Sequence, residues 1–311
     1  MIPREMHAIL GFLTFAIGTV VGSFVNVCVY RIPWQKSVIW PDSRCPRCLA
    51  TIEARHNVPI LGWLALRGKC RSCRLPISAR YPMVEALVGV LFVAIYLADL
   101  AAVPRGLTGQ DAALLGLRAA YHMTLVALLV AATFIDFDLY VIPDEVTVTG
   151  MVLGLAAGTL APGMRPDPAT AATAWDGFLV GLIGILVGGG LVWGIRIAAG
   201  VVLRREAMGF GDVTLLAMIG AFLGWQAAVL TFFLAPFFGL LPSLAKLVVL
   251  TWKALRGRKS SGADHELPFG PYLSMAALTL TLGWPWIWSG WAKNLFAAFP
   301  VVFYYVLGLD S

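Results

Sequence analysis

Charged residues are what this sequence most lacks. Only 13% of its 311 residues are Asp, Glu, Lys or Arg, and just 17 are acidic, whereas roughly a quarter of the residues in a soluble domain are charged. In their place, 59% of the residues are hydrophobic and the mean hydropathy is +0.81. This shortage of charge excludes an ordinary soluble domain and predicts a membrane protein.

Long apolar runs set the predicted fold class. A transmembrane helix needs about 20 apolar residues, and eight runs approach or exceed that length, so we predict an all-α polytopic membrane protein with about eight transmembrane helices. The runs are 8–30, 82–103, 114–135, 145–161, 177–203, 211–225, 227–252 and 271–290. A shorter run, 296–309, contains Pro300 and is either an interfacial helix or a ninth crossing. The first run is expected to stay in the membrane rather than act as a cleaved signal peptide.

One polar insert interrupts the apolar runs. The predicted organisation is a first transmembrane helix (1–30), an insert (31–81) and a membrane-embedded domain (82–311). Ten of the 23 Lys and Arg residues fall between Arg31 and Arg80, against two acids, Asp42 and Glu53. The positive-inside rule therefore places the insert in the cytoplasm.

The same rule can be applied to the later loops. With eight spans, the loops 196–205 and 246–259 fall on the cytoplasmic side as well, which puts 18 of the 23 basic residues there. These basic faces suit anionic lipid head groups. No aromatic and basic pattern suggests a nucleic-acid partner.

Four of the five cysteines form two C-x-x-C pairs in the insert. Cys45 and Cys48 make the first pair, Cys70 and Cys73 make the second, and 21 residues lie between the two pairs. This spacing is typical of a structural zinc site, in which four thiolates close a tetrahedron. Two disulfides are the alternative, although a cytoplasmic insert would disfavour them. His56 lies between the pairs as a bystander, and Cys28 is expected to pack as an apolar residue in the first span.

The few acids gather at two places that the predicted topology puts at the cytoplasmic ends of helices. Asp136, Asp138, Asp144 and Glu145 follow the third span, and Asp212 opens the sixth after Gly209 and Gly211. A carboxylate in such an apolar context is costly to bury and marks a candidate functional site. The plainer interpretation is that Asp212 caps a helix and that the first group is a solvated turn.

A pair of carboxylates would explain both groups of acids. Two carboxylates in a partly desolvated site share one proton, which is the aspartic-protease arrangement. One takes a proton from water and the other hydrogen-bonds the peptide carbonyl oxygen. Glycine next to Asp212 lets a substrate backbone approach closely. Two other classes stay open: an ion-coupled membrane carrier, because buried acids also line ion pathways, and a membrane assembly factor whose zinc insert docks a partner.

Several segments, taken together, resemble the type IV prepilin peptidase family, also called leader peptidase with N-methyltransferase, which are GxGD-type membrane aspartic proteases. The resemblance covers most of the chain, and its motifs occur in the family's order. They are residues 22–33, the two cysteine pairs with 57–63 between them, 77–82, 134–138 with 142–144, the G-x-G-D box at 209–212, and 268–271.

The resemblance implies a specific function. Asp136 and Asp212 would be the catalytic pair, with Asp138, Asp144, Gly209 and Gly211 in support. The enzyme would lie in the bacterial inner membrane and remove, at its cytoplasmic face, the basic leader of type IV prepilins and type II secretion pseudopilins.

The resemblance also implies methylation of the new amino terminus by S-adenosylmethionine. Gly68 occupies a position linked in the family to methyl transfer. The residues themselves do not predict this activity, because no G-x-G-x-x-G loop opens a βαβ unit. Thr214 stands where the family often has Lys. This departure bears on a local charge contact that the Lys would make, and not on the catalytic pair.

Overall fold

The structure, a computed structural model, describes residues 4–102, 109–165, 173–203, 208–256 and 268–298. Within these ranges the chain is helical and contains no β-strand, which confirms the predicted all-α class. Each of the eight predicted runs is matched by one long helix. These helices are α1 (Arg4–Arg31), α3 (Arg80–Ala101), α4 (Gly109–Leu139), α5 (Asp144–Leu160), α6 (Ala174–Leu203), α7 (Phe210–Leu223), α8 (Trp225–Leu255) and α9 (Gly270–Ile287).

Short helical segments occupy the connections. They are the 3₁₀ turns Ile32–Trp34, Ala54–His56 and Pro162–Met164, the helix α2 (Leu61–Ala65) and a π-helical turn (Trp288–Ala292) that continues α9.

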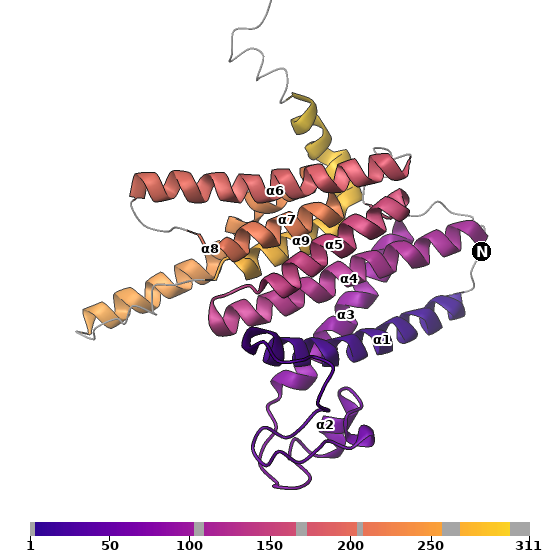
Figure 1. Cartoon of the computed structure of the whole chain (residues 1–311), viewed down its shortest axis with the longest axis vertical. Helices are drawn as coiled ribbons and strands as arrows, with labels where there is room; N and C mark the ends of the chain where they lie inside the picture. Colours follow the sequence, from indigo (N-terminus) through magenta and orange to yellow (C-terminus); the bar gives the residue numbers. More distant parts are fainter. Residues whose placement is uncertain (1–3, 103–108, 166–172, 204–207, 257–267, 299–311) are drawn as a thin grey trace, which may run out of the picture.

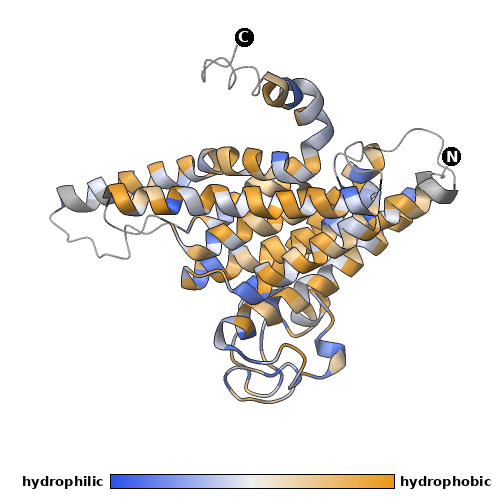
Figure 2. Cartoon of the chain, turned by 45° about the horizontal axis from the view of Figure 1, so that its top comes forward, coloured by the Kyte–Doolittle hydropathy of each residue, from blue (hydrophilic) through white to orange (hydrophobic). Residues whose placement is uncertain are grey.

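Five helices, α1, α3, α4, α6 and α8, are long and apolar enough to cross a membrane by length and composition. Large hydrophobic side chains are exposed along the bundle, among them Val201, Phe237 and Leu241, and Figure 2 shows apolar residues covering the outer faces of the helices. Such surfaces suit lipid rather than water. The count of eight crossings stays a prediction, and most of the run 296–309 lies outside the described residues.

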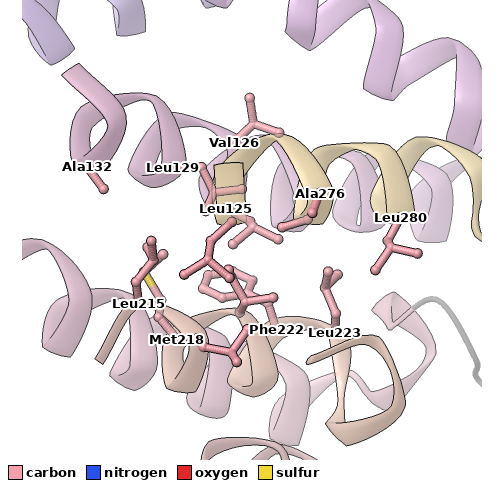
Figure 3. Close-up of a cluster of buried hydrophobic side chains, with 14 of the residues drawn as sticks. Leu125, Val126, Leu129, Ala132, Leu215, Met218, Phe222, Leu223, Ala276 and Leu280 are labelled. Carbon is pink, nitrogen blue, oxygen red and sulfur yellow. The ribbon is translucent and has the colours of Figure 1, made fainter. Parts of the chain in front are cut away.

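The helix α7 forms the centre of the bundle. Every residue from Asp212 to Leu223 is buried, and α7 packs against α5, α6, α8 and α9 (Figure 1). Leu215, Met218 and Phe222 of α7 meet side chains of α4 and α9 in the main hydrophobic cluster (Figure 3). The start of α7 is therefore fixed by neighbours on all sides.

Glycines allow the helices to approach closely. Gly184 of α6 faces Gly220 of α7, and a Cβ on either would run into the backbone of the other. In α1, a Cβ on Gly18 would lie 2.7 Å from Cα of Gly89 in α3. Small residues commonly mediate such contacts between membrane helices.

The insert lies beyond the last turn of α1 and the first turn of α3 (Figure 1). The side-chain amide of Asn26 in α1 donates a hydrogen bond to the carbonyl oxygen of Tyr81 in α3, at 3.1 Å. Two isolated β-bridges, Arg44 with Thr51 and Lys69 with Pro76, close the loops that carry the cysteine pairs. The insert is thus attached to the bundle at both of its ends.

Candidate active site and cysteine cluster

Asp136 lies in the last turn of α4 and is only 5% exposed. Its Oδ2 accepts a hydrogen bond of 3.1 Å from the backbone N–H of Gly270, the first residue of α9. A Cβ on Gly270 would come within 2.6 Å of that oxygen. The carboxylate is therefore held by a backbone that only glycine allows to come so near.

Asp212 lies in the first turn of α7 and is 8% exposed. The chain before it is extended at Gly209, where a Cβ would lie 3.8 Å from Asp212 Oδ2. A carboxylate at a helix N-terminus also faces the positive end of the helix dipole. At the two glycines of the G-x-G-D segment, no side chain therefore separates the backbone from this carboxylate.

One residue, Ile142, joins the two acids into a single site. Cβ atoms on Gly211 and Gly270 would each come within 2.8 Å of the Ile142 side chain. Asp136 and Asp212 are also near enough to interact electrostatically. Four segments therefore converge here: the end of α4, the connection before α5, the start of α7 and the start of α9.

The acids that neighbour Asp136 in the sequence do not join this buried pair. Asp138 is exposed, and its two oxygens accept hydrogen bonds of 2.8 and 2.7 Å from the guanidinium of Arg80. That guanidinium also stacks over the ring of Phe134, 5.0 Å from its centre. Asp144 is exposed in the first turn of α5. Burial thus distinguishes Asp136 from its neighbours in sequence.

Thr214 makes a local contact and no charged one. Its hydroxyl donates a hydrogen bond of 3.1 Å to the carbonyl oxygen of Gly211, in the same first turn of α7. The side chain is buried. It supports the turn that presents Asp212.

The four cysteines of the insert converge as their spacing predicts. Their sulfur atoms all lie within 4.8 Å of one another and could hold a metal ion. The Sγ atoms of Cys45 and Cys73 are 3.9 Å apart, as are those of Cys48 and Cys70. All five cysteines are free of disulfides. Cys28 is buried in α1, and His56 faces Glu53 at 3.8 Å rather than joining the cluster.

Backbone hydrogen bonds prepare Cys45 for a cation. The N–H groups of Cys48 and Arg47 stabilise the thiolate of Cys45 and lower its pKa to about 6. Thiolates are the form in which cysteines bind metal.

Gly68 packs against an aromatic ring beside the second cysteine pair. Its φ is +67°, and a Cβ there would lie 2.8 Å from Cζ2 of Trp63. The indole N–H of Trp63 donates a hydrogen bond to the carbonyl oxygen of Ile77, and the backbone N–H of Ile77 donates one to the carbonyl oxygen of Gly68. Gly68 therefore fixes how α2 packs on the end of the insert.

Sequence reasoning missed a buried acid in α3. Glu85 accepts a hydrogen bond of 2.7 Å from the backbone N–H of Ile60 and so ties α3 to the insert. It lies where α1 and α3 touch, since a Cβ on Gly22 would be 2.7 Å from its Cα. The available signal was an acid inside an otherwise apolar run.

A second buried polar group lies far from Asp136 along α4. Asp99 of α3 lies 2.9 Å from Nδ1 of His122 and 3.0 Å from Nε of Arg118. Arg165, only 2% exposed, donates to the carbonyl oxygens of Gly158, Gly177 and Ala221. The guanidinium NH groups of Arg165 are thus bound by main-chain carbonyls, while Nε of Arg165 and Nε2 of His122 have no hydrogen-bond partner among the described residues.

Two family models match the chain. The model of the bacterial peptidase A24 N-terminal domain matches residues 16–98, and that of the type IV leader peptidase family matches residues 123–244. The first covers the second half of α1, the insert and most of α3, and the second covers both aspartates. No solved structure matches the chain.

Several relatives match at the level of sequence. A prepilin leader peptidase/N-methyltransferase of Aeromonas hydrophila is 34% identical, with 85% of this chain and 87% of the relative aligned. The protein of the same name from Stutzerimonas stutzeri is 31% identical over 96% of this chain and 98% of the relative. One from Myxococcus xanthus is 38% identical, but the match spans 73% of this chain and 60% of that relative. The chain therefore belongs to the type IV leader peptidase family.

Proposed function

We propose that this protein is a membrane aspartic endopeptidase that removes the leader of type IV prepilins and pseudopilins and then methylates the new amino terminus. The convergence of Asp136 and Asp212 around Ile142 is the observation that carries the peptidase activity. The relatives' names support the substrate and the second activity.

The proposed hydrolysis uses the two carboxylates and one water molecule. With one proton between them, the ionised carboxylate takes a proton from water, and the water oxygen attacks the scissile carbonyl carbon. The protonated carboxyl group hydrogen-bonds the carbonyl oxygen as negative charge develops there. The N–H of Gly270 holds Oδ2 of Asp136, which leaves Oδ1 for the water or the substrate.

The experiment that tests this assignment is cleavage of a prepilin by the purified protein. Asp136→Asn and Asp212→Asn should each lower the cleavage rate by about 10³-fold. Each variant removes either the carboxylate that takes a proton from water or the carboxyl group that hydrogen-bonds the carbonyl oxygen. Glu145→Gln is the matched control, since this exposed acid lies in the same region outside the pair. Cleavage at the normal rate by either Asp variant would refute the assignment.

The cysteine cluster fits a structural zinc ion. Four thiolates at about 2.3 Å from a tetrahedral ion lie about 3.8 Å apart. This is close to the 3.9 Å that separates Cys45 Sγ from Cys73 Sγ and Cys48 Sγ from Cys70 Sγ. Four protein ligands leave no position for a reacting water, so zinc would stabilise the insert and take no part in peptide hydrolysis. Metal analysis of the purified protein should give one zinc per chain.

We further place the insert and the two aspartates at the cytoplasmic face of the inner membrane. The excess of basic residues in the insert supports this orientation, and the contact of Arg80 with Asp138 joins the insert to the end of α4 that carries Asp136. A membrane-impermeant thiol reagent applied to spheroplasts should leave a single cysteine introduced at Lys36 unmodified and should label it in inverted vesicles. Labelling in intact spheroplasts would reverse the topology.

A further inference from the structure

A cavity of about 370 Å³ lies between the last turns of α1 and the insert. Small-molecule sites commonly have volumes of about 300–1,000 Å³, apolar walls and a few polar groups. The walls here include Val27, Val38 and Ile52, and the polar groups are Arg31, Asp42, Ser43 and Asn57. The cavity therefore has the volume of a site for a small ligand, and its lining is polar and partly open to solvent, which suits a charged ligand.

Asp42 is the unusual member of this lining. The insert has ten basic residues and two acids, and the other acid, Glu53, is paired with Arg55 at 2.7 Å and Arg71 at 3.0 Å. Among the described residues, none pairs with the exposed carboxylate of Asp42. An unpaired acid in so basic a surrounding offers its charge to a cationic ligand.

The loop that carries Asp42 is held in place by Arg31. The guanidinium donates hydrogen bonds to the carbonyl oxygens of Ser37, at 2.9 Å, and Pro41, at 2.6 Å. The guanidinium of Arg31 therefore donates its hydrogen bonds to main-chain carbonyl oxygens and not to the Asp42 carboxylate. The cavity wall is thus fixed to the end of α1, and its carboxylate is left free.

The position of the cavity suits the second reaction of the proposed function. The last turns of α1 are tied to the start of α3 by Asn26, and the start of α3 is tied to the end of α4 by Arg80 and Asp138. The cavity thus lies at the same end of the bundle as Asp136. A new amino terminus released there stays near this surface, because the hydrophobic segment that follows it remains in the bilayer.

We propose that this cavity binds S-adenosylmethionine, with Asp42 facing its cationic centres. This inference rests on the proposed function. The neutral amine of the cleaved substrate attacks the methyl carbon and forms an N–CH₃ bond. The S–CH₃ bond breaks, its electron pair stays on sulfur, and the amine loses a proton to water. The other product is S-adenosylhomocysteine, whose sulfur is uncharged.

The change of charge at sulfur provides a sharp test. Radiolabelled S-adenosylmethionine and S-adenosylhomocysteine would be bound to the purified full-length protein by equilibrium dialysis. Asp42→Asn should weaken binding of the cationic donor by about tenfold or more, as expected for loss of a charge-assisted contact, and binding of the neutral-sulfur product by less. Glu53→Gln, which removes the other acid of the insert, is the control and should leave both affinities unchanged.

A second variant tests the cavity without altering charge. Ala54 lines the cavity and is exposed, so Ala54→Phe should fill part of the space and weaken binding of both ligands. Both variants should cleave prepilin normally, because both residues lie in the insert and the two aspartates lie in the helical bundle. The proposal is overturned if both variants bind S-adenosylmethionine normally, or if Asp42→Asn raises the KM for prepilin cleavage while donor binding is unchanged. Failure of the wild-type protein to cleave prepilin would instead refute the proposed function.

Discussion

The proposed active site and the cysteine-bearing insert are held together by different kinds of interaction. At the buried carboxylate pair, helices are locked by close glycine contacts and by burial. The insert has little apolar core, since most of its residues are exposed, and it depends on four sulfurs, a few turns and its attachment to α1 and α3. A domain of about 50 residues usually needs such a staple. The peptidase and methyl-transfer activities should therefore be separable.

The largest expected effect is the loss of one cysteine from each pair. In small zinc domains metal binding and folding are one equilibrium, so Cys45→Ser with Cys70→Ser should unfold the insert and abolish methylation. Cleavage should persist because the carboxylate pair is built by the bundle. Limited proteolysis of residues 31–80 and separate cleavage and methylation assays would measure this. Loss of both cleavage and methylation while the bundle stays folded would show that the two activities are not separable.

A large effect confined to the bundle is expected from Gly270→Ala. The added Cβ cannot share space with Oδ2 of Asp136, and a displacement of about 1 Å in a catalytic group can lower a rate by about 10²-fold. Cleavage kinetics would show this as a fall in kcat, with zinc content unchanged. Gly283→Ala in the same helix is the control, because its Cβ would meet only the flexible end of Ile287. Equal activity of both variants would count against a positioning role for Gly270.

A moderate effect confined to the insert is expected from Gly68→Ala. The left-handed backbone and the contact with Trp63 should together destabilise the local fold by about 1–3 kcal/mol, and methylation should fall more than cleavage. Hydrogen exchange over residues 61–77 would report the loosening. Adding Trp63→Phe, which removes the clashing atom, should restore part of the protection. If the double variant is no better than the single one, packing is not the reason for glycine here.

The smallest effect is expected where the two regions meet. Arg80 and Asp138 are both about 40% exposed, and ion pairs of this kind contribute about 0.2–1 kcal/mol. Asp138→Asn and Arg80→Gln should each change cleavage less than about threefold, and the double variant should show little coupling beyond that. A tenfold fall in the cleavage rate for Asp138→Asn alone would indicate that Asp138 takes part in the reaction.

The sequence predicted the elements well and the site in part. Hydropathy located the eight main helices because each contains an apolar run with few charged residues. The regular spacing of the cysteines predicted their convergence, and Asp212 was recognisable because it stands alone. Asp136 could not be chosen from its acidic neighbours by local pattern, because its burial depends on Gly270, 134 positions later. The pairing of Glu85 with Ile60 and of Gly68 with Trp63 likewise depends on tertiary packing that no short motif encodes.

The shortness of α7 has a consequence for how a peptide reaches the carboxylates. Its 14 residues rise about 21 Å, less than the roughly 30 Å of a hydrocarbon core, and α8 begins directly after Gly224. The two ends of α7 therefore cannot both reach the head groups of an undeformed bilayer. Because other helices rather than lipid surround α7, its carboxylate end can lie below the level of the head groups without exposing main chain to lipid. A peptide bond next to a membrane anchor can then be hydrolysed without drawing that anchor out of the lipid.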